Sequence, residues 1–229
     1  YHFDMHGGPY AYQWINTNPF WKISEQMNLA AQYGATRIWI VNVGDLKPME
    51  FPIEYFLTYA WAPAKWPYER IGEFSEQWAA REFGPTNASE IAALVNGYTK
   101  LNGRRKPELI EPGTFSLVNY REAERVLAEW QDLVSRAEKI EAVLPTAAHD
   151  AFFQLVGYPV AITAAANERY FRSELARADE ARGRDPRSNQ KASATAQKRI
   201  TEATERYQNL ANGKWRHIVT ESGVSPKAW

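Results

Sequence analysis

The chain has 229 residues, and its 27 Lys and Arg residues balance 27 Asp and Glu residues, so the formal net charge is zero. This balance argues against a nucleic-acid-binding domain, which carries a basic footprint, and no run approaches the roughly 18 apolar residues of a membrane span. Cys is absent, which excludes disulfide bonds, thiolate catalysis and zinc–thiolate sites. The chain begins at Tyr1 without an initiator Met or a signal-peptide pattern, and we therefore expect a piece of a longer protein.

Composition divides the chain into two parts. Residues 1–78 hold 18 of the 31 aromatic residues and carry more acidic than basic side chains, whereas the remainder is rich in Ala, Glu, Arg and Gln. Pro63 and Pro67 lie close together between two helical patterns, which is typical of a joint between structural units. The sequence therefore predicts one domain over residues 1–66 and a second over residues 67–229.

The first part predicts the order strand, helix, strand, helix. The predicted ranges are residues 1–6, 20–33, 37–44 and a stretch that follows Pro48. Residues 37–44 form an apolar, β-branched run without polar alternation, which is typical of a parallel strand covered on both faces. The last helix would bury Phe51, Tyr55 and Tyr59 along one face. This order is the βαβ unit of an α/β sheet or barrel, and with only two strands visible we expect the rest of the sheet to lie elsewhere.

Everything after Pro67 has a helical pattern. The predicted helices span residues 68–83, 88–101, 119–144, 147–182 and 190–213. The third has an apolar stripe that starts at Tyr120, and Asn119 with Glu122 three residues later is a capping pattern. Pro159 predicts a kink in the fourth helix at residues 155–158. Five helices with apolar stripes predict an all-α antiparallel helical bundle.

Polar side chains lie at the ends of both predicted strands. His2 and Asp4 project to the same side of an extended chain, and Asn42 and Asp45 follow the second strand. Because ligands of α/β folds bind beyond the carboxyl ends of the strands, we predict that these four residues bind substrate. Three alternatives remain open: Asp45 caps the next helix, Asn42 satisfies loop backbone, and His2 with Asp4 is a hydrogen-bonded core pair.

A metal site is a weaker alternative for the first strand. His2, Asp4 and His6 alternate along it, and a zinc site needs at least three protein ligands. The other two histidines, His149 and His217, fall far away in the helical part. We therefore expect no metal and no other cofactor. The aromatic rings around the Gly7-Gly8 turn would suit stacking on sugars, although they suit a hydrophobic core equally well.

Several segments resemble glycoside hydrolase family 115. The longest is Ile38-Trp39-Ile40-Val41-Asn42-Val43-Gly44-Asp45-Leu46-Lys47-Pro48. The others are residues 2–9, 12–17, 26–30, 33–35, 52–56 and 213–216. The resemblance is strong up to about Trp61 and looser over the helices.

The resemblance implies an α-glucuronidase that removes glucuronic acid, often 4-O-methylated, from xylan side chains with inversion. It implies an α/β fold, the end of a TIM-barrel-like catalytic domain, followed by the helical bundle. The expected partners are glucuronoxylan or a related polysaccharide, the remainder of the same protein and a possible second copy, with no nucleic acid and no membrane. It also implies a secreted or periplasmic location.

Site residues follow from the resemblance by position. His2 matches the family's active-site histidine, Asn42 matches an asparagine that lines the sugar pocket, and Asp4 lies in the same motif. The family's proposed acid lies upstream of Tyr1, so we expect this chain alone to be inactive. Its own nearby carboxylates, to which neither catalytic role is assigned, are Asp4, Asp45, Glu50 and Glu54.

Two positions depart from the family's pattern. Met5 stands where the family usually has Tyr, which removes a hydroxyl near the substrate, and Tyr10 stands where a basic residue is frequent. These departures favour the alternative function, a non-catalytic carbohydrate-binding or scaffold protein derived from the same fold.

Overall fold

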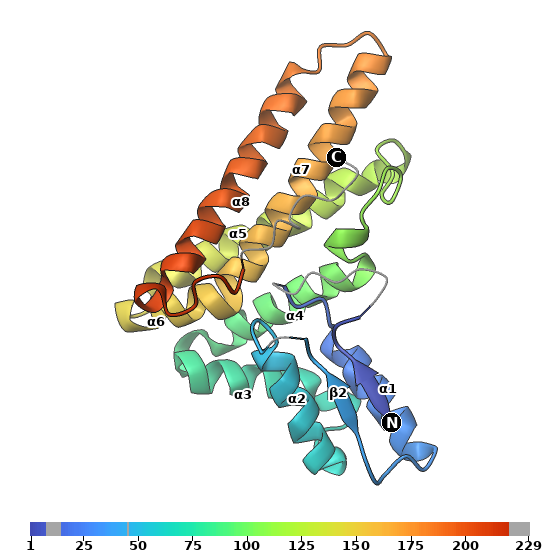
Figure 1. The fold of residues 1–229 in the computed structure, drawn as a ribbon, viewed down its shortest axis with the longest axis vertical. Helices are drawn as coiled ribbons and strands as arrows, with labels where there is room; N and C mark the ends of the chain where they lie inside the picture. The colour runs from blue at the N-terminus through green and yellow to red at the C-terminus, as the bar shows by residue number, and fades with distance from the viewer. Residues whose placement is uncertain (8–14, 45, 220–229) are drawn as a thin grey trace.

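The computed structural model describes residues 1–7, 15–44 and 46–219 (Figure 1). Its strands and helices are β1 (His2–Asp4), α1 (Phe20–Gln32), β2 (Ile40–Asn42), α2 (Glu50–Trp61), α3 (Ile71–Phe83), α4 (Ala88–Arg104), α5 (Glu122–Val143), α6 (Thr146–Phe152), α7 (Tyr158–Ala181) and α8 (Arg187–Gly213). Short 3₁₀ turns connect several of them, and a π-helical turn (Phe153–Gly157) joins α6 to α7. No helix within the described ranges is both long and apolar enough to cross a membrane.

The two strands form a parallel pair, as predicted, with Phe3 opposite Val41 in the register. Successive side chains of a strand point to opposite faces, and the face that carries Phe3 packs on α2. The Phe3 and Phe56 rings lie 6.2 Å apart, and Trp39 stacks on Tyr59 at 6.2 Å. The sheet therefore has one face buried against α2.

The prediction that the second strand is covered on both faces is wrong for the described chain. Ile38 is 69% exposed and Ile40 is 57% exposed. Both lie on the face opposite α2, and no described element covers that face. The sheet consequently presents an open face whose residues are partly apolar.

Local sequence explains α1 and α2. Phe20, Ile23, Met27 and Ala30 recur at helical spacing along α1, and all are buried, which is the amphipathic pattern of a surface helix. Gly34 has a positive φ of 85° just after α1, a conformation that favours glycine at a helix C-terminus. In α2 the predicted stripe of Phe51, Tyr55 and Tyr59 is buried.

The helical second half is confirmed. The five predicted helices correspond to α3, α4, α5, the combined α6–α7 segment and α8. Figure 1 shows α7 and α8 as a long antiparallel hairpin that extends away from the sheet, while α3 lies beside α2. One core cluster contains buried residues from β1 and α1 through α7, so apolar side chains from both sides of the predicted boundary near residue 66 pack together. The boundary itself, like the barrel, stays a prediction.

The predicted start of the third helix is wrong by three residues. Tyr120 and Arg121 have positive φ values of 54° and 51°, so α5 begins at Glu122. Asn119 does not cap it: the Asn119 amide donates to Ser116 Oγ over 2.8 Å, and Tyr120 is 87% exposed rather than part of the apolar stripe. A left-handed turn displaces both residues from the helix.

Where a kink is predicted before Pro159, the structure has a π-helical turn. The π-helical turn covers Phe153–Gly157 and ends two residues before Pro159. Proline has no backbone N–H and its ring clashes with the carbonyl four residues earlier, and a π-helical turn is one way for a helix to accommodate such a disruption. This turn also places Gln154 toward the first half of the chain, as described below.

Candidate functional site

The carboxyl ends of the two strands are held together by Asn42. The Met5 amide donates to the Asn42 carbonyl over 2.9 Å, which extends the pairing of the strands. The Asn42 side-chain Nδ2 donates to the His6 carbonyl over 2.9 Å, and the Gly44 amide donates to Asn42 Oδ1 over 3.3 Å. The structure thus realises the alternative in which Asn42 satisfies loop backbone, while the residue itself remains exposed.

His2 and Asp4 lie side by side on the open face of the sheet. His2 Nε2 is 3.4 Å from Asp4 Oδ1, and the two side chains are 55% and 54% exposed. The alternative of a buried core pair is therefore wrong. The register places Asp4 opposite Asn42 at the carboxyl ends and His2 opposite Ile40, so three of the four predicted site residues share one face of the sheet. This face offers an imidazole, a carboxylate and an amide to a ligand.

Other sequence predictions fall elsewhere. Asp45 and Tyr10 lie outside the described residues. Met5 is 3% exposed and belongs to the core cluster, so the side chain at this position packs inward. Within the described ranges, no group of three or more His, Asp or Glu side chains is arranged to hold a metal ion, and His2, Asp4 and His6 do not form one.

Gly44 allows a close contact that the sequence analysis did not single out. It has a positive φ of 65°, and a Cβ built on it would lie 2.8 Å from His6 Cδ2. Only glycine fits a backbone that combines this conformation with so close a neighbour. The sequence does contain a signal for this contact, because a glycine directly follows the apolar strand.

A network of polar side chains connects the end of β1 to α4. Asn18 Nδ2 donates to the Met5 carbonyl over 3.0 Å and to Asn16 Oδ1 over 3.1 Å. The Asn16 carbonyl accepts from Asn102 Nδ2 of α4 over 3.2 Å, and Asn16 Nδ2 donates to the Tyr98 hydroxyl over 3.4 Å. Burial raises the pKa of Tyr98, so it remains a neutral phenol. These residues link the strand end to α4, and the sequence analysis missed them.

Two of the nearby carboxylates are engaged in ion pairs. Glu50 Oε1 accepts from Lys47 Nζ over 2.7 Å and from Gln154 Nε2 over 2.8 Å. Glu54, one helical turn later, accepts from the guanidinium of Arg81 on α3 over 2.6 and 2.7 Å. Glu50 therefore binds Lys47 in the loop that follows β2, whereas Glu54 binds α3.

Comparison with known proteins places this geometry in a family context. Residues 1–109 match the family model described as glycosyl hydrolase family 115. A solved structure of a family GH115 4-O-methyl-α-glucuronidase, titled as having specificity for decorated arabinogalactans, superposes with a TM-score of 0.81 and 28% identity over 96% of this chain. A search of curated proteins gives no match. The chain spans 30% of the length of that solved structure.

Proposed function

Because the resemblance to glycoside hydrolase family 115 is confirmed by the family model and by the solved glucuronidase, we propose that this chain supplies one wall of an α-glucuronidase active site. The longer protein would remove (4-O-methyl)glucuronic acid from xylan side chains with inversion. The observation that carries the proposal is that the matched residues include both strand ends, where His2, Asp4 and Asn42 share one face.

The chemistry of this face suits a uronic acid. The His2 imidazole can donate to a sugar hydroxyl or carboxylate, and Asp4 beside it can accept from hydroxyls and orient the ring. Asn42 adds a rigid position because both ends of its amide are held by backbone groups. These residues would bind and position the sugar rather than carry the proton transfers.

Inverting hydrolysis needs an acid and a base roughly 6.5–9.5 Å apart. Glu50 and Glu54 already pair with Lys47 and Arg81, and the described residues assign neither of them a catalytic role. On the basis of the resemblance, we propose that the segment preceding Tyr1 supplies the acid.

The open sheet face supports a role for the rest of the protein. Ile38 and Ile40 are exposed on it, and apolar strand residues of this kind are normally covered. We propose that the remainder of the same protein covers this face, and that the polysaccharide substrate places the protein in a secreted or periplasmic setting.

The test compares the longer protein with residues 1–229. Release of (4-O-methyl)glucuronic acid is measured from glucuronoxylan oligosaccharides and from decorated arabinogalactan. We expect release by the longer protein and none by residues 1–229 alone. Release by residues 1–229 would contradict an acid located upstream, and saccharide binding by the longer protein without release would favour a non-catalytic carbohydrate-binding protein.

Replacement of Asn42 tests the site within the longer protein. We expect Asn42→Ala to lower kcat/KM on glucuronoxylan at least about tenfold, which corresponds to about 1.4 kcal/mol of transition-state stabilisation. Thr36→Ala, an exposed position before β2, is the control and should retain the wild-type value. Unchanged kinetics in a folded Asn42→Ala protein would refute the assignment of Asn42.

A further inference from the structure

Three segments that are distant in sequence converge just after Asn42. Lys47 follows Asn42 by five residues, and its ammonium lies 2.7 Å from Glu50 Oε1 in the first turn of α2. Gln154, 104 residues further along the chain, donates to the same oxygen over 2.8 Å. A single carboxylate oxygen therefore binds Lys47, in the loop between β2 and α2, and Gln154 of the π-helical turn.

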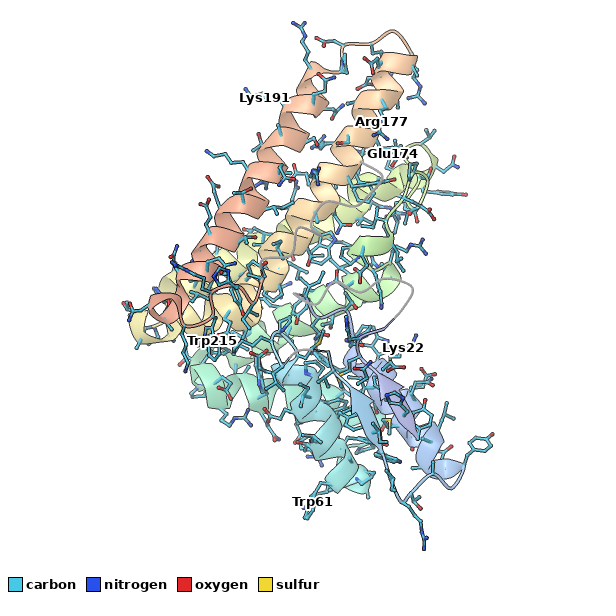
Figure 2. The ribbon with its side chains drawn as sticks, in the orientation of Figure 1. Lys22, Trp61, Glu174, Arg177, Lys191 and Trp215 are labelled. Atoms are coloured by element: carbon cyan, nitrogen blue, oxygen red, sulfur yellow. The ribbon has the colours of Figure 1, made fainter. Side chains whose placement is uncertain are left out.

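Trp215 covers this contact. The Lys47 ammonium lies 4.1 Å from the centroid of the Trp215 ring, a distance at which a cation is attracted by the face of an aromatic ring. Figure 2 shows Trp215 where the lower end of α8 meets the first half of the chain. The Lys47 side chain is only 16% exposed, so its charge is partly desolvated. Breaking an ion pair in such a setting destabilises a protein more than breaking one on the surface.

The surroundings of Glu50 make its partners costly to lose. Glu50 Oε2 is buried and has no hydrogen-bond partner within the described ranges. Burial raises the pKa of Tyr98 and of Tyr207, and the nearby charge of Glu50 raises both further. The Glu50 side chain as a whole is 30% exposed, so removing one of its partners leaves a partly desolvated charge with less compensation, which is unfavourable.

We propose that Lys47, Glu50 and Gln154 form a clamp through which the helical half of the chain positions Asn42, and that Gln154 is a positioning residue of the hydrolase site. The inference rests on the proposed function of Asn42. It gives the helical half an indirect part in the site, through Gln154 and Trp215, which both belong to it.

The chain contains a matched control on the same helix. Glu54 lies one turn after Glu50 and pairs with Arg81, whose side chain is 54% exposed. This pair has the same chemistry but joins α2 to α3, and it does not contact the segment that follows Asn42. Arg81→Met therefore removes the ion pairs of Arg81 with Glu54 and Glu82 without releasing the clamp.

The first measurement is kinetic and uses the longer protein. We expect Gln154→Met and Lys47→Met to lower kcat/KM on glucuronoxylan at least about fivefold. Lys47→Arg, which keeps the charge, should restore the value to within about twofold of wild type, and Arg81→Met should leave it unchanged. Equal losses in Lys47→Arg and Lys47→Met would overturn a clamp based on charge.

The second measurement does not depend on activity. Hydrogen exchange is followed in the same proteins over peptides that cover residues 40–50. We expect Gln154→Met to speed exchange there at least about threefold, and Arg81→Met to leave it unchanged. Unaltered exchange in Gln154→Met overturns the clamp. Faster exchange in a longer protein without hydrolase activity would support the clamp while refuting the proposed function.

Discussion

At the scale of single residues, Gly44 permits the close approach of His6 to the end of β2. Its positive φ and the 2.8 Å approach of a built Cβ to His6 Cδ2 predict that Gly44→Ala lowers the free energy of unfolding by two separate effects. The left-handed backbone costs an L-residue about 1–2 kcal/mol, and crowding against the ring adds about 1–3 kcal/mol. Urea unfolding of the chain measures the sum.

Gly34 separates these two effects. It also has a positive φ, but a Cβ built on it meets no atom within 4 Å. Gly34→Ala should therefore lose only the backbone contribution, and Gly44→Ala should be less stable by at least about 1 kcal/mol. Equal losses in the two variants would show that the His6 contact does not constrain Gly44.

At the scale of elements, α8 packs through Tyr207, a tyrosine with a buried hydroxyl that is unpaired among the described residues. Tyr207 is fully buried, its ring lies 4.7 Å from that of Tyr158, and its hydroxyl has no hydrogen-bond partner in the described part of the chain. Burying an unpaired hydroxyl is unfavourable. We expect Tyr207→Phe to leave the free energy of unfolding unchanged or to raise it by up to about 1 kcal/mol.

Tyr98 on α4 provides the contrast, because its hydroxyl accepts from Asn16. Tyr98→Phe should destabilise the chain by about 1 kcal/mol, since it leaves a buried amide unpaired. Thermal or urea unfolding measures the free energy of unfolding of the two variants. A larger decrease in Tyr207→Phe than in Tyr98→Phe would contradict these hydrogen bonds.

At the scale of the whole molecule, buried phenols make stability sensitive to alkaline pH. Burial is the main cause of a raised pKa in Tyr55, Tyr98, Tyr158, Tyr170 and Tyr207. An unfolded tyrosine titrates near pH 10, whereas the pKa of Tyr55 in the folded chain is raised to about 12. Because the raised pKa belongs to the folded state, the associated stability is full below about pH 10 and is lost as the pH rises toward the folded values.

Urea titrations across this range test the prediction. The midpoint should fall progressively from about pH 10 upward, and phenolate absorbance should increase together with unfolding. A midpoint that stays constant between about pH 9 and pH 11.5 would show that these tyrosines ionise equally in both states.

The helices could be predicted because their signals are local. Apolar spacing in α1, α2 and α5 and the position of Pro159 each depend on neighbours within a few turns, and the structure follows them. The capping pattern at Asn119 was misleading because the same residue types also favour turns, and here Ser116 accepts the amide of Asn119.

The site could be predicted only in part. The alternation of His2 and Asp4 and the polar end of β2 were sufficient to place His2, Asp4 and Asn42 on one face. The apolar character of Ile38 and Ile40 predicted a covered strand, but an apolar strand reflects the environment of the whole protein, while these residues are exposed in this chain. The contact of Glu50 with Gln154 joins positions 104 residues apart, and no local pattern contains such information.

The separation between Glu50 and Trp215 also has a consequence for biosynthesis. Domains fold as units during synthesis at about 5–20 residues per second, and about 165 residues separate Glu50 from Trp215. On a ribosome, β2 and the first turn of α2 would thus emerge roughly 8–33 s before the ring that covers Lys47. During that interval the apolar side chains of α2, such as Phe51 and Tyr55, would lack the later helices that share their core cluster, and transiently exposed apolar surface of this kind is prone to aggregation.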